Sequence, residues 1–309
     1  MTTEHSILDA IGNTPLVELR RIVPSGHARI IVKMEGANPT GNMKDRMAKA
    51  AVEAAEADGR LRPGGTVVEY SGGSTGASLA LVCAAKGYGL KIVTSDAFSK
   101  EKTRTTQAFG AEMISIPSEG RKITETLIRA MIETAKRISR EPGHWWCDQL
   151  NNPDAASGYR SMGEEIWEQS GEKVDAFVQA VGTAHSLNGV TDVLRRYNPA
   201  LYVAAAEPAE SAILSGRAKG SHRIEGIGIG FTPPHWRPDM VDEVQTATTR
   251  EATEMCRRLA REEAIFAGTS SGLNIIAALR IAERLGPGAT VATIMIDSGL
   301  RYLSTDLYQ

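Results

Sequence analysis

The sequence predicts an α/β protein of two domains, each with a parallel-type sheet flanked by helices. Short β-branched runs alternate with alanine-rich runs of helical spacing, and turn residues separate them. Strands that alternate with helices form parallel sheets that helices cover on both faces. The length of 309 residues is enough for about two domains of the usual ~150 residues.

The first half of the chain predicts three βα repeats. Its β-branched runs predict strands at 30–33, 66–70, 91–95 and 113–116. Apolar residues at helical spacing predict helices over 43–58, 75–85 and 100–109. Gly59 and the run Pro63–Gly65 end the first of these helices. The loop at 145–153 is the expected crossing between the domains.

The second half repeats the pattern. Strands are expected at 174–181, 201–206 and 289–296, and helices over 187–197 and 272–285. Parallel sheets bind ligands beyond the carboxyl ends of their strands, where loops enter helix N-termini. Loops of small residues occupy such positions at 71–76, 182–189 and 268–272.

Composition excludes several classes of protein. Lys and Arg total 35 against 37 for Asp and Glu, so the net charge of −2 offers no bulk attraction for nucleic acid or anionic membranes. The cysteines Cys83, Cys147 and Cys256 are far apart, which predicts neither a disulfide framework nor a zinc site. The start has no leader pattern, and no apolar run approaches the ~20 residues of a membrane span. We expect a soluble cytoplasmic protein without a metal.

Lys44 is the first candidate for chemistry, because it opens the predicted helix 43–58. A lysine there lies beside the positive end of the helix dipole, which disfavours its charged form. A Schiff-base lysine needs a neutral amine, since that form is the nucleophile. A solvated surface lysine is the alternative that spacing leaves open.

Two loops are candidates for binding an anion. Ser71–Gly76 brings N–H groups and hydroxyls to a helix N-terminus, which suits a carboxylate or a phosphate, but no Gly-Lys-Ser/Thr follows as in a Walker loop. Gly182–Ser186 also follows an apolar strand and opens a helix. Capped turns are the alternative for both loops. His185 taken alone is equally well a capping or packing residue.

Two further glycine-rich segments carry weaker signals. Gly226–Gly230 has the spacing of a dinucleotide fingerprint, but no convincing strand precedes it and Pro233–Pro234 blocks a following helix, so we reject that interpretation. Gly268–Gly272 opens the last predicted helix, and its serines are either caps or hydrogen-bond partners of a ligand.

Together these segments resemble the cysteine synthase family, the O-acetylserine sulfhydrylases, which are pyridoxal-phosphate enzymes of the tryptophan-synthase-β-like fold (fold type II). The likeness runs nearly end to end, in order through 11–16, 38–46, 69–76, 109–112, 149–153, 181–190, 225–233, 268–272 and 297–302. It implies a small, mobile, substrate-clamping domain at 40–148 and a large cofactor-binding domain at 1–39 plus 149–309. It also implies a homodimer.

The resemblance assigns roles to the candidate residues. Lys44 would form the Schiff base with the cofactor, pyridoxal 5′-phosphate, and then remove and return the substrate Cα proton. Ser270 would face the pyridine nitrogen, where a neutral hydroxyl suits β-elimination over transamination. The cofactor phosphate would be bound by Gly182, Thr183, Ala184, His185 and Ser186. The substrate carboxylate would be clamped by Ser71, Gly72, Gly73, Ser74, Thr75 and Gln149, and this contact would close the small domain.

The activity implied is β-replacement. An O-activated L-serine, either O-acetylserine or O-phosphoserine, loses its leaving group to give an aminoacrylate, and a small nucleophile adds to Cβ. With sulfide the product is L-cysteine. The alternatives are β-elimination, as in serine or threonine dehydratases, and replacement by a nucleophile other than sulfide. A non-catalytic binding protein is disfavoured, because it would not need Lys44 together with Ser270.

Three departures from the family pattern predict a divergent branch. Ser74 stands where the family has an asparagine that bonds the cofactor ring oxygen, and Tyr70 replaces a proline. The family's phosphate loop Gly-Thr-Gly-Gly-Thr reads Gly-Thr-Ala-His-Ser here. The loop keeps its shape only if neither lost glycine needs a positive φ. His185 would add a contact to the phosphate or line the entrance for the nucleophile.

Overall fold

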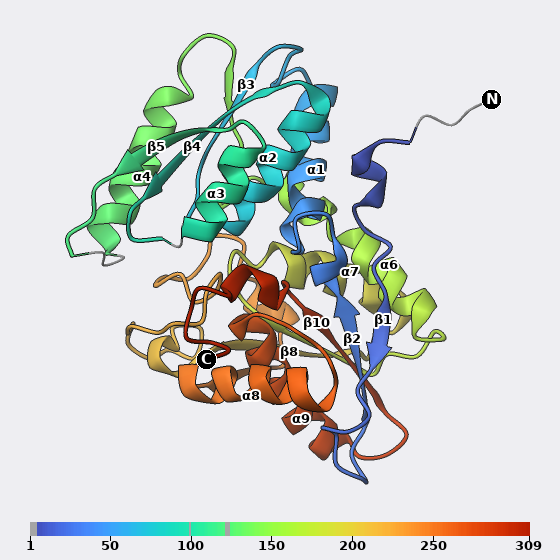
Figure 1. Ribbon diagram of the computed structural model, residues 1–309. Coiled ribbons are helices and arrows are strands. Elements are labelled where there is room, and N and C mark those ends of the chain that lie inside the picture. The colour runs from blue at the N-terminus through green and yellow to red at the C-terminus, as the bar shows by residue number, and fades with distance from the viewer. Residues whose placement is uncertain (1–4, 99, 121–123) are drawn as a thin grey trace. The chain divides into compact units, whose positions relative to one another are not determined.

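The computed structural model describes residues 5–98, 100–120 and 124–309 (Figure 1). The first four residues, which entered the argument about a leader, lie outside this range. The chain divides into two compact units. Unit 1 comprises Met1–Ile11 and Lys44–Gly158, and unit 2 comprises Gly12–Met43 and Tyr159–Gln309.

Unit 1 is built on a four-stranded parallel sheet with the order β5-β4-β3-β6. Its strands are β3 (Thr66–Tyr70), β4 (Gly89–Ser95), β5 (Glu112–Ile116) and β6 (His144–Trp146). Its helices are α1 (Lys44–Ala57), α2 (Ser74–Lys86), α3 (Lys100–Ala108), α4 (Glu125–Ile138) and α5 (Asp154–Ser157). Both α2 and α4 pack against β3 and β4.

Unit 2 is built on a six-stranded sheet with the order β1-β2-β10-β7-β8-β9. Its strands are β1 (Leu16–Glu18), β2 (Arg29–Met34), β7 (Ala176–Ala180), β8 (Tyr202–Pro208), β9 (Glu243–Ala247) and β10 (Thr290–Met295). Its helices are α6 (Arg160–Gln169), α7 (His185–Tyr197), α8 (Thr249–Glu262) and α9 (Thr269–Leu285). Helix α9 packs against the sheet, and α8 runs beside α9 (Figure 1).

The predicted fold class is confirmed. Every residue of β7 and β10 is buried, as expected of strands that carry continuous apolar runs and are covered on both faces. One pairing differs from the expectation of purely parallel sheets, because the short β1 runs antiparallel to β2 at the sheet edge. An edge strand this short has too few residues to show a periodic pattern in the sequence.

The two units differ from the predicted domain ranges at both ends of the small domain. Residues 5–11 belong to unit 1, residues 40–43 belong to unit 2, and the crossing expected at 145–153 follows Gly158. Residues 149–158 belong to unit 1, where the Gln149 N–H donates to Glu69 and Arg60 donates to Asp154. The role of a mobile, substrate-clamping domain stays a prediction.

The three cysteines are buried free thiols. Among the described residues, no helix is long and apolar enough to cross a membrane.

Candidate active site

Lys44 is the first residue of α1 and the first residue of unit 1 after the chain leaves unit 2. Its side chain is half-buried, and the loss of hydration lowers the pKa of its ammonium group to about 8. Electrostatic interactions with Cys147 and, to a smaller extent, with Glu69 act in the opposite direction. The lowered pKa that the sequence predicted is therefore found, but burial is its main cause.

Glu69 is a buried carboxyl group on β3 that sequence reasoning passed over. Burial raises its pKa to about 8, although the backbone N–H groups of Tyr70 and Gln149 both donate to it, each at 2.9 Å. It thereby joins the carboxyl ends of the neighbouring strands β3 and β6. A glutamate inside the otherwise apolar run Thr66–Tyr70 was the signal in the sequence that could have found it.

Thr75 and Gln149, both predicted to bind a carboxylate, lie together in unit 1. The Thr75 hydroxyl donates to Gln149 Oε1 at 2.6 Å, and Gln149 Nε2 donates to the Tyr70 carbonyl at 3.1 Å. With the backbone bond to Glu69, three hydrogen bonds therefore fix Gln149 against the loop that follows β3. Tyr70 itself is buried as the last residue of that strand.

The loop Ser71–Gly76 is folded around the Ser71 hydroxyl. Ser71 Oγ accepts from the N–H groups of Gly73 and Gly76, each at 3.0 Å, and α2 begins at Ser74. Gly72 passes close to the Phe98 ring, so that a Cβ at this position would lie 2.4 Å from a ring carbon. A larger residue at 72 would therefore require the Phe98 ring to move.

In unit 2, the start of α9 is tied to the carboxyl ends of two neighbouring strands. Asn274 Oδ1 accepts from the Ala180 N–H at the end of β7, and its Nδ2 donates to the Ile294 carbonyl on β10. Ser270 lies one turn earlier in α9 and is buried. The Met43 N–H donates to the Ile296 carbonyl just beyond β10, so the residue that precedes Lys44 is fixed at this same edge.

The loop Gly182–Ser186 leads from β7 into α7. The first backbone bond within the helix runs from the Asn188 N–H to the Ala184 carbonyl at 3.0 Å. The N–H groups of the preceding residues are thus not used by the helix, as at any helix N-terminus. Gln179 Nε2 donates to Ser186 Oγ, which leaves the Ser186 hydroxyl proton available to a ligand. This donor set suits a phosphate.

The backbone at Ala184 and His185 shows whether either position of a lost glycine needs a positive φ. Ala184 has φ 68° and ψ −11°, in the left-handed region, so one of the two positions does need a positive φ. The other position, His185, is already the first residue of α7. The loop keeps its turn, although the left-handed conformation of an alanine is unfavourable by about 1–2 kcal/mol.

We predict that Ala184→Gly stabilises the protein. Glycine adopts the left-handed region without strain, but it also loses more conformational freedom on folding, so the net gain should be about 0.5–1 kcal/mol. Urea unfolding of the cofactor-free protein measures it. The matched control is Ala50→Gly in the interior of α1, which should cost about 1 kcal/mol. A lower free energy of unfolding in Ala184→Gly would contradict the conclusion that Ala184 is strained.

Sequence reasoning missed His235, which touches the same loop. The rings of His185 and His235 pack with their centroids 4.5 Å apart and tilted by 44°. His185 Nδ1 lies 2.9 Å from Thr183 Oγ1, and Asn188 Nδ2 donates to the His235 carbonyl at 2.8 Å. No periodic pattern or motif connects residue 235 to residue 185 in the sequence.

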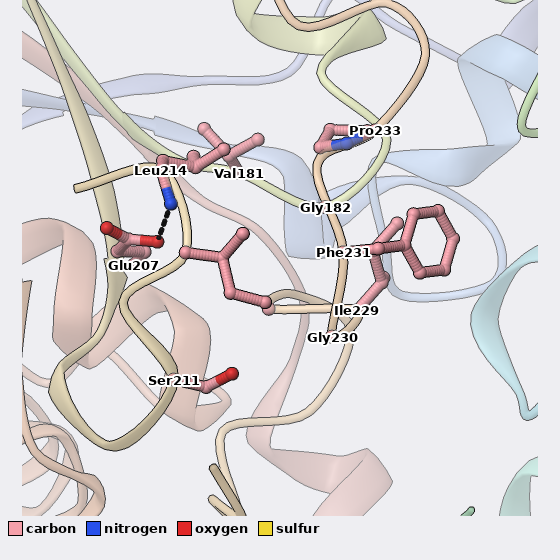
Figure 2. Close-up of a pocket in the computed structure, with 11 residues that line it drawn as sticks. Val181, Gly182, Glu207, Ser211, Leu214, Ile229, Gly230, Phe231 and Pro233 are labelled. Atoms are coloured by element: carbon pink, nitrogen blue, oxygen red, sulfur yellow. Dashed lines mark hydrogen bonds between the residues drawn. The ribbon is translucent and has the colours of Figure 1, made fainter. Parts of the chain in front are cut away.

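A small pocket adjoins Gly182, between the ends of β7 and β8 and the segment Gly228–Pro233 (Figure 2). Glu207 Oε2 accepts from the Leu214 N–H at 2.8 Å, the bond drawn in Figure 2. The buried Ser211 hydroxyl has no hydrogen-bond partner among the described residues. The pocket has room for about one water molecule.

The secondary structure around Gly226–Gly230 is as the sequence predicts. Within the described residues, no strand precedes Gly226–Gly230 directly and no helix begins at it. All three glycines instead have positive φ angles, and Gly228 and Gly230 line the small pocket.

The predicted site residues are divided between the two units. Unit 1 holds Lys44, the loop Ser71–Thr75 and Gln149, and unit 2 holds the loop Gly182–Ser186 and Ser270. Within unit 1 the structure brings Thr75 and Gln149 into contact. Within unit 2 it places the loop Gly182–Ser186 and Ser270 at strand ends on one edge of the sheet. Their individual roles stay predictions.

Comparisons with known proteins agree with the family resemblance seen in the sequence. A family model described as "Pyridoxal-phosphate dependent enzyme" matches residues 7–297. A cysteine synthase of Staphylococcus aureus (strain Mu50) is 39% identical over 305 residues, which cover 98% of this chain and 96% of the relative. The match extends over almost the whole length of both proteins.

Solved structures are equally similar. A cysteine synthase from Entamoeba histolytica has a TM-score of 0.91 and 38% identity, covering 98% of this chain and 90% of that one. An O-acetylserine dependent cystathionine β-synthase from Helicobacter pylori has a TM-score of 0.92 and 32% identity over 100% of both chains. This chain therefore belongs to the family of pyridoxal-phosphate dependent enzymes.

Proposed function

We propose that the protein catalyses β-replacement on an O-activated L-serine, with sulfide as the nucleophile and L-cysteine as the product. The observation that carries the proposal is Lys44, whose amine has a pKa of about 8 at the start of α1. It occurs in a chain that matches a cysteine synthase along nearly its full length. O-acetyl-L-serine is the proposed donor, since the Helicobacter pylori relative is named for its dependence on it.

Residues within each unit are chemically suited to a part of the cofactor, pyridoxal 5′-phosphate. Lys44 offers an amine for the aldehyde, and a lowered pKa makes the neutral form of that amine available. The loop that opens α7 offers hydroxyls and N–H groups to the phosphate, and Ser270 offers a neutral hydroxyl to the ring nitrogen. When bound, the cofactor withdraws electrons from the substrate Cα and makes its proton acidic.

The chain's own side chains supply binding and proton transfer. We assign the removal of the Cα proton, and its later return, to the neutral amine of Lys44. The substrate carboxylate takes hydrogen bonds from the loop Ser71–Thr75 and from Gln149, where the Thr75–Gln149 contact already gathers two of the donors. A substrate carboxylate that replaces this contact would accept from both side chains.

A second candidate function differs in the nucleophile. The Helicobacter pylori protein is named a cystathionine β-synthase, and it has a TM-score of 0.92 to this chain. Cystathionine contains the carbon skeleton of homocysteine. In this reaction the thiol of homocysteine would therefore replace sulfide as the nucleophile, with the same donor. Tyr70 and Ser74, at which this chain departs from the family pattern, are the positions at which the nucleophile would be selected.

The test is a product analysis of the full-length protein loaded with pyridoxal 5′-phosphate. O-acetyl-L-serine or O-phospho-L-serine is supplied alone, with sulfide, or with L-homocysteine, and the products are identified by mass spectrometry. We expect L-cysteine from O-acetyl-L-serine and sulfide. Preferential formation of cystathionine would favour the second candidate, and pyruvate without a nucleophile would favour elimination. No turnover of either donor would contradict all three.

Two further assignments stay predictions. A homodimer and a cytoplasmic location are expected from the family resemblance. Sedimentation of the full-length protein would test the first, and fractionation of cells the second.

A further inference from the structure

His185 is placed to act on Thr183 rather than directly on a ligand. Its side chain is 1% exposed, and its Nδ1 lies 2.9 Å from the Thr183 hydroxyl oxygen. The left-handed turn at Ala184 makes this possible, because it turns the chain between residues 183 and 185. A glycine at 185 has no side chain and could make no such contact.

The direction of this hydrogen bond decides what Thr183 can offer a ligand. If His185 Nδ1 accepts, the single proton of the Thr183 hydroxyl is used within the loop. If Nδ1–H donates, the Thr183 oxygen is the acceptor and its own proton is available to an anion. A phosphate provides acceptor oxygens, so only the second arrangement makes Thr183 a ligand for it.

His235 supports the imidazole from the other side. Its ring packs on that of His185 at 4.5 Å, and its carbonyl accepts from Asn188, which lies on α7 one turn after His185. The segment that carries His235 is itself a tight turn, since the Trp236 N–H donates to the Pro233 carbonyl at 2.9 Å. The ring of His185 is thus held between α7 and a proline-restricted turn.

We propose that His185 and His235 form a positioning pair that keeps the Thr183 hydroxyl proton directed at the cofactor phosphate. His185 donates from Nδ1 to Thr183 Oγ1, and His235 fixes the ring in that orientation. The inference rests on the proposed phosphate site at Gly182–Ser186. His185 departs from the family pattern, and the proposal gives it a role in binding the cofactor.

The test measures cofactor binding by the full-length, cofactor-free protein in a double-mutant cycle. Dissociation constants for pyridoxal 5′-phosphate are determined for the parent, His185→Leu, Thr183→Val and the double variant. We expect His185→Leu to weaken binding roughly tenfold, and to have little further effect once Thr183 is valine. His185→Asn, which places an amide N–H near the position of Nδ1, should restore most of the affinity. His235→Leu should show a smaller loss.

Two readouts separate positioning from a general loss of structure. Pyridoxal, which lacks the phosphate, should bind the parent and His185→Leu equally well. The ³¹P resonance of the bound cofactor should shift in His185→Leu and return in His185→Asn. His27→Leu, at the opposite end of β2 from the ligand-binding edge of the sheet, is the matched control and should change neither quantity.

The possible failures are distinguishable. Equal affinities of Thr183→Val and the parent for pyridoxal 5′-phosphate would overturn the phosphate site itself, and the pair with it. A loss in Thr183→Val combined with an undiminished effect of His185→Leu in that background would overturn only the positioning pair. Equal losses for pyridoxal and its phosphate in His185→Leu would also overturn the pair, since its action requires the phosphate.

Discussion

Replacing Lys44 by alanine is expected to lower the rate of β-replacement by about 10³-fold or more. General acid–base catalysis by one positioned side chain contributes 10²–10⁴-fold, and here the same amine is also the attachment point proposed for the cofactor. The lowered pKa makes this lysine suited to both tasks, because at neutral pH its uncharged form is far more abundant than that of an ordinary lysine. The rate of L-cysteine formation from O-acetyl-L-serine and sulfide measures the effect.

Lys49 provides the matched control, since it lies on the same helix α1 and donates to the Leu8 carbonyl at 3.1 Å. Lys49→Ala should keep the activity within a few-fold of the parent. Lys44→Arg distinguishes positive charge from nucleophilic amine, and it should be as inactive as alanine because a guanidinium does not lose its proton at neutral pH. Retention of more than a tenth of the activity in Lys44→Ala would contradict the assignment.

Much of the fold could be predicted because β-branched and alanine-rich runs differ clearly in composition. Strands of both sheets, such as β3 in unit 1 and β7 and β10 in unit 2, were found from the sequence. The elements that were not predicted include short or polar strands, and also the amphipathic helices α4, α6 and α8, whose helical spacing could have been recognised. Strand β6 has three residues, and β9 contains Glu243 and Gln245, whose side chains bond to arginines of α9.

The candidate site could be predicted where a motif occupies consecutive residues, and it was missed where chain segments far apart meet. The low pKa of Lys44 was expected from a helix dipole, but it follows from burial, which depends on neighbours that the local sequence does not specify. The contact between His185 and His235 joins residues fifty positions apart, and the bond from Gln149 to Glu69 joins residues eighty apart. Periodicity contains no information about such pairs.

The conformation of Ala184 shows a different limit. Sequence reasoning identified the question correctly, since a lost glycine matters only where φ is positive. The answer needed the backbone, which has φ 68° at this residue. Alanine tolerates that angle at a modest energetic cost, so the substitution is compatible with the loop's turn, while the histidine beside it gains a contact with Thr183.

Replacing Gln149 by alanine is expected to raise the KM for O-acetyl-L-serine by roughly 10–100-fold, with a smaller change in kcat. A hydrogen bond to a charged group contributes about 1.5–3 kcal/mol, and the variant removes one proposed donor to the substrate carboxylate. It also removes the acceptor of the Thr75 hydroxyl, which is 2.6 Å from Gln149 Oε1 in this structure. Steady-state kinetics at saturating sulfide measures both constants.

Gln149→Glu sharpens this prediction, because it keeps the shape of the side chain and the acceptor for Thr75 but adds a negative charge. If Gln149 faces the substrate carboxylate, the like charges repel each other, and the KM of Gln149→Glu exceeds that of Gln149→Ala. If Gln149 only braces the loop after β3, Gln149→Glu loses the bond to the Tyr70 carbonyl but keeps the acceptor for Thr75. Its KM then does not exceed that of Gln149→Ala, and the carboxylate site is wrong. Gln107→Ala, an exposed glutamine on α3 of the same unit, should leave both constants unchanged.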